Sequence, residues 1–418
     1  MKLWKVTIEA RSPLVFPIRK PGEQFRESLP FVPGATLYGA LGGAGVDTAL
    51  LERVRCYNAY PAAPGDPWAR PLPLTAAAPK GARPRANAPR TFDAKPADTL
   101  IDRVCWELMR PAALIYAPTD GEGRGWKGAA GCYAPPQSGD LRGQTSRRVA
   151  QRVMTRVSIN RRRGTAEEQR LYSFLAISEV NQFTRYAWND QGQEQGVSGP
   201  FATLFLGGAA GPDDLDLAPL LEKIDQIGGR LTTGMGLVSL TAEPAAPDDG
   251  AAVLERIRRM NQRFRRSAAR YERLGPAETW RPTGDLFTIN LLSDAILREQ
   301  RWRPTTILGA DVLREAAGLR TADLRLLRSF ALPGIAGGWN VVWPGHKPTS
   351  VSTAAGAVFV FQAPGGLAEG DAARLAQLQL EGIGDRRPEG YGQVRICDDF
   401  HIDPAYALDY AQFVEEQA

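Results

Sequence analysis

Residues 227–240 read IGGRLTTGMGLVSL, and residues 383–396 read IGDRRPEGYGQVRI. The two stretches align without a gap as I-G-x-R-x-x-x-G-x-G-x-V-x-[L/I], at an offset of 156 residues. The identical pairs are Ile227/Ile383, Gly228/Gly384, Arg230/Arg386, Gly234/Gly390, Gly236/Gly392 and Val238/Val394. Self-similarity of this kind is the signature of an internal repeat. We therefore expect two related units, each ending in a glycine loop (residues 228–236 and 382–392) and a strand.

The beginnings of the two units share a second pattern. Residues 3–14 (LWKVTIEARSPL) and 286–297 (LFTINLLSDAIL) each predict a strand, and the first alternates with the period of two typical of a half-buried strand. A helix is predicted after each strand, over residues 35–41 and 308–317. The starts differ by 283 residues and the ends by 156, so the first unit is expected to carry about 127 extra residues, that is 283 − 156. The predicted fold class is α+β.

The extra residues differ in composition from the rest of the chain. Residues 60–100 are rich in proline and alanine and predict extended loop, while residues 118–165 are rich in glycine and arginine. Residues 166–206 return to a strand pattern, with aromatic residues close to arginines. The predicted organisation is a first domain over 1–245 with insertions at about 60–200, a basic helical linker over 246–280, a second domain over 281–400 and a tail over 401–418.

The helix expected between the units is strongly basic. Its apolar residues recur every three or four positions, with arginines opposite them, over residues 254–274. This arrangement is typical of a helix that packs on a domain with a solvated basic face. Contact of that face with RNA or with an acidic partner is the alternative.

Positive charge is concentrated in two segments, although the net charge of the chain is small. The 51 basic residues against 46 acidic ones give only +5, but 43 of the basic residues are arginines. Residues 142–185 hold ten arginines and three acids, and residues 253–273 hold eight arginines and two acids. A GC-rich genome explains abundant arginine but not this clustering. Local fields of this size attract polyanions.

Several classes of protein are excluded. With 43% hydrophobic and 23% charged residues, the composition is that of a globular protein. Its longest apolar runs are far shorter than the roughly 20 residues of a membrane-spanning helix, and the N-terminal stretch lacks the apolar core of a signal peptide. The four cysteines form no C-x-x-C pair, so we expect reduced thiols, a cytoplasmic location and no zinc site. No cofactor is expected.

The glycine loops are the candidate binding elements. Closely spaced glycines let a backbone approach a ligand, their N–H groups can line a phosphate, and arginines add charge-assisted hydrogen bonds. In the second loop Arg386, Arg387 and Tyr391 accompany the glycines, a combination that suits single-stranded RNA. The alternative is a tight turn in which glycine only supplies unusual dihedral angles. Neither loop is a P-loop or a dinucleotide-binding fingerprint.

These features resemble the RAMP superfamily of CRISPR-associated proteins. Similar stretches, in the family's order, are FVPGATLYGALGG (31–43), YNAYPAAPGDPWARPLPLTAAAPK (57–80), VSINRRRGTAEEQRLYSFLAISEV (157–180) and GIGDRRPEGYGQVRI (382–396). The last of these is similar to the Cas-five-like RAMP subunit of type III-D effector complexes. The resemblance extends from residue 3 to residue 396.

The resemblance implies both a fold and a function. The fold is a pair of tandem ferredoxin-like (RRM-type) domains with a large insertion in the first. The function is that of a subunit which holds the 5′ handle of CRISPR RNA in antiviral defence and caps a filament of Cas-seven-like backbone subunits. It would also contact a Cas-ten-like large subunit and, indirectly, target RNA, with no membrane. The implied RNA-binding residues are Arg147, Arg148, Arg161, Arg162, Arg163, Arg230, Gly234, Gly236, Gly384, Arg386, Arg387, Gly390, Tyr391 and Gly392. At the positions of Arg387, Pro388 and Glu389, the first loop has Leu231, Thr232 and Thr233. For the first loop, a purely structural role is therefore the alternative to RNA binding.

Two enzymatic alternatives remain open. A repeat-processing ribonuclease would use a histidine as general acid or base. His346 is the weak candidate for that role, and His401 is expected to be exposed or to cap a helix. A backbone subunit that cleaves target RNA would instead use an acidic loop residue, here Glu23 or Glu27. The paired aspartates at 213–214, 248–249 and 398–399 favour turn or cap roles. We expect no enzymatic activity and no metal site.

Overall fold

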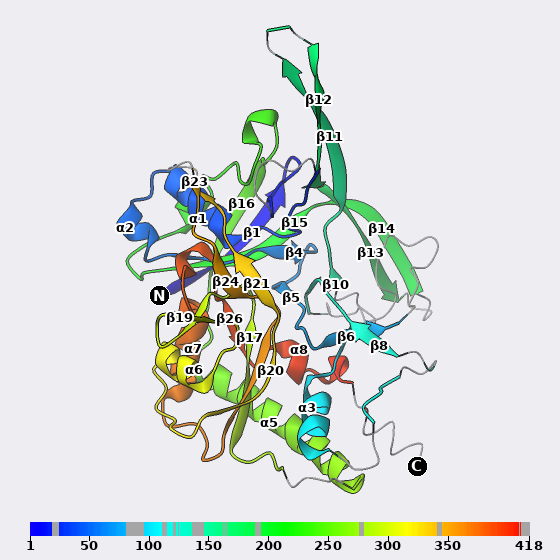
Figure 1. Ribbon diagram of the computed structural model, residues 1–418, viewed down its shortest axis with the longest axis vertical. Coiled ribbons are helices and arrows are strands. Elements are labelled where there is room, and N and C mark those ends of the chain that lie inside the picture. Colours follow the sequence, from blue (N-terminus) through cyan, green and yellow to red (C-terminus); the bar gives the residue numbers. More distant parts are fainter. Residues whose placement is uncertain are drawn as a thin grey trace. The chain divides into compact units, whose positions relative to one another are not determined.

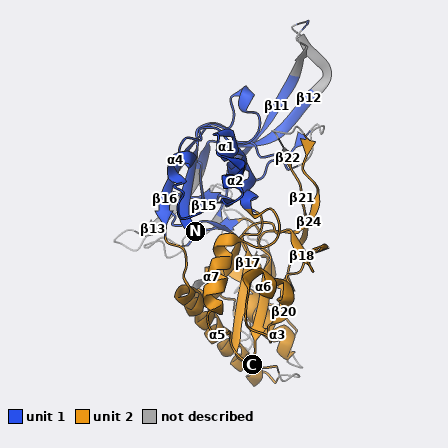
Figure 2. Cartoon of the chain, turned by 90° about the vertical axis from the view of Figure 1, so that its left-hand side faces the viewer, with its two compact units in different colours: residues 1–70, 132–245, 388–390 blue, residues 71–131, 246–387, 391–418 orange. Residues whose placement is uncertain are grey.

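The computed structural model describes residues 1–18, 25–80, 96–110, 115–119, 123, 125–135, 146–160, 162–163, 165–188, 194–275, 280–340, 345–408 and 410. Strands and helices are mixed along the chain, which confirms the α+β class (Figure 1). The chain divides into two compact units (Figure 2). Unit 1 comprises residues 1–70, 132–245 and 388–390, and unit 2 comprises residues 71–131, 246–387 and 391–418.

Unit 1 is organised around an antiparallel sheet. Its strands, in spatial order, are β16 (Val238–Ala245), β1 (Lys2–Ala10), β15 (Leu204–Gly211) and then β3 (Arg55–Cys56) and β4 (Tyr60–Ala62), which both pair with β15. Along β1 every second side chain is buried, as the alternation predicts: Trp4, Val6, Ile8 and Ala10. These side chains pack with α1 (Gly34–Gly43), which confirms the first helix, and with residues near α4 (Ala218–Leu221).

Unit 2 contains a second sheet of the same design. Its strands, in spatial order, are β26 (Val394–Ile396), β17 (Asp285–Leu291), β25 (Val358–Ala363) and β20 (Arg325–Phe330). Every residue of β25 is buried, because this apolar strand lies inside the sheet. The helices α6 (Ala310–Ala317) and α7 (Asp371–Glu381) separate the strands along the chain, and α6 confirms the second predicted helix.

The two sheets have the same topology. In each, the first strand lies between the last two, and the order along the chain is β-α-β-β-α-β. That order is the one a ferredoxin-like domain has. Ile8 lies opposite Leu240 and Ile289 lies opposite Ile396, so the first strands correspond at an offset of 281 residues. The sequence comparison placed this offset at 283, because two alternating strands match almost equally well after a shift of two residues.

The described residues between 166 and 206 are mainly in strands, as expected. They contribute to two long antiparallel ribbons of unit 1, formed by β11 (Gln151–Asn160) with β12 (Thr165–Ile177) and by β13 (Val180–Trp188) with β14 (Glu194–Ala202). The first ribbon extends well beyond the sheet of its unit (Figure 1). The short strand β2 (Phe25–Arg26) pairs in parallel with β12.

The remaining elements are short. The strands are β5 (Arg70–Pro71), β6 (Ala76–Pro79), β7 (Ala97–Asp98), β8 (Trp126–Gly128), β9 (Cys132–Tyr133), β10 (Ser146–Arg147), β18 (Leu297–Glu299), β19 (Arg303–Thr305), β21 (Pro333–Ala336), β22 (Trp339–Asn340), β23 (Gly345–His346) and β24 (Ser350–Thr353). The helices are α2 (Thr48–Leu51), α3 (Leu100–Met109), α5 (Gly250–Arg273) and α8 (Asp399–Ile402), with 3₁₀ turns at 231–233, 387–389 and 404–406. No helix in the described ranges is long and apolar enough to cross a membrane.

Part of the predicted insertion belongs to unit 2. Residues 71–131, which the sequence placed within the first domain, lie in unit 2, and α3 packs there against α5. Residues 60–100 were expected to be extended loop throughout, but the amphipathic helix α3 begins at their end. Its buried side chains include Ile101, Val104 and Met109, so this helix adds to the core of unit 2.

The basic segment after the first unit is one helix, α5, and this confirms the predicted helix. Asp249 caps its N-terminus by accepting a hydrogen bond from the backbone N–H of Ala252, at 2.8 Å. Its buried face contains the predicted residues Ile257, Met260, Phe264, Ala268 and Tyr271, together with Val253, Arg256 and Asn261. Leu254, which the apolar spacing also placed on this face, is only half-buried. Asp398 caps α8 in the same way, by accepting a hydrogen bond from the N–H of Phe400. One aspartate of each of the pairs 248–249 and 398–399 is therefore a helix cap, as expected.

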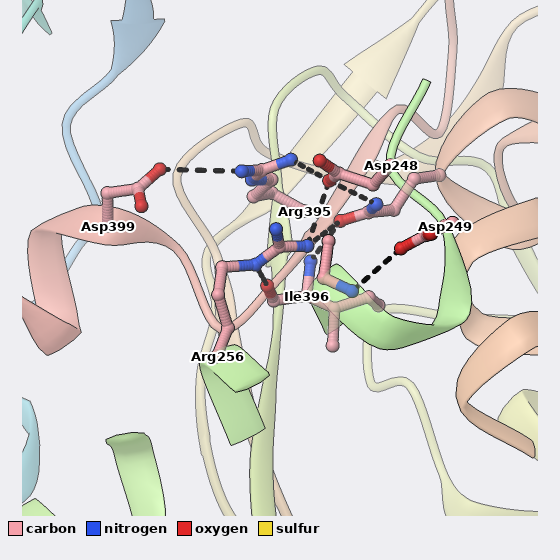
Figure 3. A network of polar contacts seen from close by, with 8 residues as sticks. Asp248, Asp249, Arg256, Arg395, Ile396 and Asp399 are labelled. Carbon is pink, nitrogen blue, oxygen red and sulfur yellow. Dashed lines mark hydrogen bonds and ion pairs between the residues drawn. The ribbon is translucent and has the colours of Figure 1, made fainter. Parts of the chain in front are cut away.

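Asp248 joins the helix α5 to the last strand, β26 (Figure 3). Its carboxylate is within ion-pair distance of Arg256 on α5, at 2.9 Å, and of Arg395 on β26. Arg256 also donates to the backbone carbonyl of Ile396. Burial by itself raises the pKa of the Asp248 carboxyl, but the Arg395 and Arg256 guanidiniums outweigh it, so that this pKa lies below its ordinary value.

Asp248→Asn is expected to lower the free energy of unfolding by about 1–3 kcal/mol at pH 7, because two charge-assisted hydrogen bonds are weakened. A carboxyl whose pKa is depressed by folding stabilises the protein above its unfolded pKa, about 3.9, and loses this contribution as the pH falls towards the folded pKa. The difference from wild type in urea unfolding should therefore shrink below about pH 4. Asp249→Asn, which keeps a capping side chain, is the matched control. A difference that stays constant from pH 7 to pH 3 would contradict the assignment.

Candidate nucleic-acid interface

The two glycine loops have the same backbone conformation at four aligned positions. All four residues have positive φ in both loops, and each loop contains a 3₁₀ turn after its arginine. The φ values are 89° and 81° at Gly228/Gly384, 64° and 56° at Arg230/Arg386, 79° and 88° at Gly234/Gly390, and 87° and 72° at Gly236/Gly392. The repeat is therefore conformational as well as compositional. Arginine adopts this left-handed conformation only where the surroundings impose it.

Close contact with backbone explains the last glycine of each loop. A Cβ added at Gly236 would lie 2.6 Å from the carbonyl oxygen of Ile227, and one at Gly392 would lie 1.8 Å from that of Ile383. No side chain fits at such distances. Gly234, by contrast, is exposed and has open space around its Cβ position. Its requirement for glycine comes from φ alone.

Some of the loop N–H groups make internal hydrogen bonds. Gly236 donates to the carbonyl of Pro13 at 3.0 Å, and Gly392 donates to the carbonyl of Asp294 at 2.8 Å. Gly234 donates to the carbonyl of Leu231 at 3.2 Å. The expectation that these N–H groups line a phosphate therefore needs correction for these three positions, because their donors tie each loop to itself or to the segment after the first strand of its sheet.

Sequence reasoning missed two serines that complete these loops. The hydroxyl of Ser12 accepts a hydrogen bond from the N–H of Leu237, and the hydroxyl of Ser293 accepts one from the N–H of Gln393, both at 2.9 Å. Both serines are buried. Ser12 lies 225 residues from Leu237, and Ser293 lies 100 residues from Gln393. Ser12 and Ser293 are equivalent only when the first strands are aligned at the offset of 281 residues.

In the first loop the arginine stacks on aromatic rings. The Arg230 guanidinium lies 4.1 Å from the ring centroid of Phe174 and 4.8 Å from that of Tyr172, both on β12. It also donates to the Tyr172 hydroxyl at 3.3 Å. These contacts are cation–π interactions, which orient the planar guanidinium. The first loop therefore has an arginine–aromatic unit despite the Leu-Thr-Thr sequence at its tip.

The second loop has an equivalent unit within its own sequence. The Arg386 guanidinium lies 4.7 Å from the ring centroid of Tyr391, whose hydroxyl donates to the carbonyl of Gly337 at 3.4 Å. The neighbouring Arg387 is partly exposed and approaches Glu381 at 3.8 Å. Both loops therefore present an arginine that is left-handed and stacked, next to a glycine-rich turn.

The Arg147 side chain is buried and paired within the protein. Its guanidinium forms a two-pronged ion pair with Asp66, at 2.6 and 2.8 Å. The Arg147 side chain is 9% exposed and that of Asp66 is 0% exposed. This ion pair links β10 to the segment around Asp66 inside unit 1. The prediction that Arg147 contacts RNA is therefore corrected, because its guanidinium is buried and bound to Asp66.

The other arginines of the segment differ in position. Arg148 is exposed and follows β10, and Arg162 and Arg163 are exposed in the turn between β11 and β12. Arg161 lies outside the described residues. The ribbon also carries Arg152, which pairs with Glu179 at 2.8 Å. The arginine-rich segment therefore supplies exposed charge along the first ribbon, with Arg147 as the exception.

The two histidines lie in unlike surroundings. His346 is exposed at the end of β23, opposite Trp339 of β22. His401 was expected to be exposed or to cap a helix, but it is completely buried in unit 2. Its Nδ1 lies 3.0 Å from the Asp98 carboxylate and its Nε2 lies 2.7 Å from the Asn290 side chain. Packing of Phe400 and Ile402 in the core draws His401 inside with them.

The acidic and sulfur-containing candidates can be located as well. Glu27 is exposed, and Glu23 lies outside the described residues. All four cysteines are free and buried, and burial raises their thiol pKa values to about 12. Within the described ranges no three His, Cys, Asp or Glu side chains are grouped as a metal site requires.

Comparisons with known proteins give low similarity. No protein-family model matches the chain, and no curated protein matches it by sequence. Among solved structures, a chain of the type III-B Cmr-beta complex bound to cognate target RNA and AMPPnP is 11% identical, with 85% of this chain and 86% of that chain covered and a TM-score of 0.40. A chain of the apo Cmr-beta complex is 12% identical, with 58% and 97% covered and a TM-score of 0.27. A chain of a type IV-B CRISPR complex is 16% identical, with 59% and 92% covered and a TM-score of 0.18.

Proposed function

We propose that this chain is a CRISPR RNA-binding subunit of a type III, III-D-like, RNA-guided effector complex. The observation that carries the proposal is the pair of glycine loops with the same left-handed arginine, stacked on an aromatic ring in both cases. The order of motifs that resembles the RAMP superfamily, from residue 3 to residue 396, supports the same assignment.

The chemistry of the loops favours a single-stranded polynucleotide. A stacked guanidinium offers both hydrogen-bond donors for a phosphate and a planar face for a base. Gly234 leaves room for a sugar-phosphate chain, because no described atom lies within 4 Å of its Cβ position, whereas a Cβ at Gly390 would lie 2.5 Å from the carbonyl oxygen of Cys56. Exposed arginines on the first ribbon extend the positive charge. Such a surface binds RNA through its phosphates, with strong dependence on salt.

The finer assignment follows from the resemblance. We propose that the second glycine loop holds the 5′ handle of CRISPR RNA and that the protein caps a filament of Cas-seven-like subunits beside a Cas-ten-like subunit. Its role in this proposal is binding, without cleavage. Incubation of the purified chain with repeat RNA tests that point, because site-specific cleavage lost in His346→Ala would make the ribonuclease alternative correct. The stoichiometry of the assembled complex tests the capping role, since a cap is present once and a backbone subunit several times.

Replacing Arg386 and Arg387 together with alanine is expected to weaken binding to repeat-handle RNA and to reduce its salt dependence. Each phosphate contact on a single strand contributes about 0.7 to the slope of log K against log salt, so the slope should decrease by about 1.4. The measurement is fluorescence anisotropy with a labelled handle RNA at several salt concentrations.

Arg325→Ala is the control for this experiment. Arg325 is exposed on β20, at the opposite edge of the same sheet from β26, so the variant removes charge away from the loop. Its salt slope should match that of wild type. If the salt slope were unchanged when Arg386 and Arg387 are both alanine, or if Arg325→Ala changed it equally, the second glycine loop would not be part of the RNA-binding surface.

A further inference from the structure

A cavity in unit 2 is lined on one side by arginines of α5. Its volume is about 230 Å³, and its lining residues are Ile101, Asp102, Arg263, Arg266, Ser267, Arg270, Pro404, Ala407 and Leu408. The lining thus comes from α5, from α3 and from the segment after α8. The lining contains three arginines and one aspartate, so its formal charge is positive.

The register of α5 explains why these arginines gather. The buried face of α5 fixes the rotation of the helix, and positions 263, 266 and 270 follow one another at spacings of three and four, so they share one face. Arg265, one position away, does not line the cavity, although Arg265 and Arg266 are both exposed. The cluster is therefore a product of helix geometry and not only of arginine content.

Arg263 and Arg266 differ in how far the protein compensates their charges. Arg263 donates through Nη1 to the backbone carbonyl of His401 and, at 3.5 Å, to that of Asp403. Within the described part of the chain, Arg266 forms no hydrogen bond or ion pair. Burial lowers the pKa of the Arg263 guanidinium, and repulsion by Arg266 lowers it further. Attraction by the Asp98 and Asp403 carboxylates raises this pKa but does not outweigh the other two effects. The cavity therefore holds like charges whose repulsion an anion would relieve.

The carboxylate in the cavity is engaged with the protein. Asp102 accepts a hydrogen bond from the Tyr271 hydroxyl at 2.9 Å, and its side chain belongs to a buried residue. Guanidinium groups match phosphate oxygens in geometry and charge. A volume below the roughly 300–1,000 Å³ of drug-sized ligand sites suits a phosphate group or a small phosphorylated molecule.

We propose that this α5 cavity binds a phosphate group. No residue of the glycine loops lines this cavity, and the proposal does not rest on the proposed function. The phosphate belongs either to the end of an oligonucleotide or to a free small molecule, and both present the same chemistry to Arg266. The group enters against the guanidinium of Arg266, while Arg263 stays tied to the backbone after α8.

Calorimetric titration of the full chain with pyrophosphate tests the site. Wild type is expected to bind saturably, and Arg266→Ala to weaken binding about tenfold, the effect of one lost charge-assisted hydrogen bond. Arg265→Ala is the matched control, since it removes the same charge from the next position and is expected to change affinity less than twofold. Equal losses in the two variants, or no saturable binding of pyrophosphate by wild type, would overturn the proposal.

A second titration identifies the source of the phosphate. Hexauridine with a 3′-phosphate and the same oligomer with a 3′-hydroxyl are compared in wild type and in Arg266→Ala. An Arg266-dependent advantage of the phosphorylated oligomer supports the site with an RNA end as its ligand. An Arg266-dependent response to pyrophosphate alone supports it with a free phosphate compound. Arg266-dependent binding of hexaglutamate without binding of pyrophosphate would overturn it in favour of an acidic protein partner.

Discussion

Arg147→Ala is expected to lower the free energy of unfolding by about 3–5 kcal/mol, because it leaves the buried Asp66 carboxylate without its guanidinium. The two-pronged pair at 2.6 and 2.8 Å satisfies both carboxylate oxygens, and Asp66 also accepts from the N–H of Ala63. Removal of one partner of a buried pair costs more than the pair contributes, since the remaining charge stays out of water. Urea unfolding of the full chain, followed by circular dichroism, measures the loss.

Two further variants separate this explanation from a general effect of charge. Arg152→Ala removes an arginine from the neighbouring strand, where the pair with Glu179 is exposed, and should cost about 0–1 kcal/mol. Combining Asp66→Leu with Arg147→Met removes both charges and should recover most of the stability lost in Arg147→Ala. If the double variant were less stable than the single one, a buried unpaired charge would not be the cause.

Gly392→Ala is the second variant for which a large effect is expected, about 3 kcal/mol or more. Two costs add: a left-handed conformation disfavours alanine by about 1–2 kcal/mol, and overlap within a packed region typically costs 1–3 kcal/mol. The added Cβ would lie 1.8 Å from the Ile383 carbonyl oxygen, so backbone must move. Because Ile383 donates its N–H to Gly392 at 2.8 Å, that movement also disturbs the hydrogen bond which closes the loop.

Gly234→Ala is the matched control for the glycine loops. Gly234 has φ of 79°, close to the 72° of Gly392, but no atom of the described residues lies within 4 Å of its Cβ position. Its substitution should therefore cost only the conformational term, about 1–2 kcal/mol. Thermal unfolding of both variants measures the difference. Equal destabilisation would show that φ alone determines the need for glycine, and the steric explanation for Gly392 would be wrong.

The glycine loops show how far the repeat could be interpreted from sequence. The pairing of Gly228 with Gly384 and of Arg230 with Arg386 predicted two equivalent turns, and the φ values agree at each aligned position. The stacking of Arg386 on Tyr391 involves residues five apart, so it could be anticipated. The stacking of Arg230 on Phe174 could not, since β12 is brought to the first loop only by tertiary packing.

The internal positions of Arg147 and His401 were beyond prediction for a related reason. Arg147 lies in an arginine-rich stretch, and its charged neighbours in sequence gave no sign of Asp66, 81 residues away. His401 follows two aspartates, but its partner Asp98 is 303 residues away. A partner at such a separation leaves no local pattern, because the contact depends on how the strands and helices of a unit assemble.

The sequence by itself determined the α+β class, the duplicated glycine loops, the amphipathic helix α5 and the alternation of β1, because each depends on spacing within a few residues of the chain. Only the tertiary structure decided which arginines are accessible, which unit residues 71–131 join, and which N–H groups of the loops are already bonded. Those properties depend on packing between segments far apart in sequence. Burial and long-range hydrogen bonds arise from that packing, and no local pattern of residues encodes them.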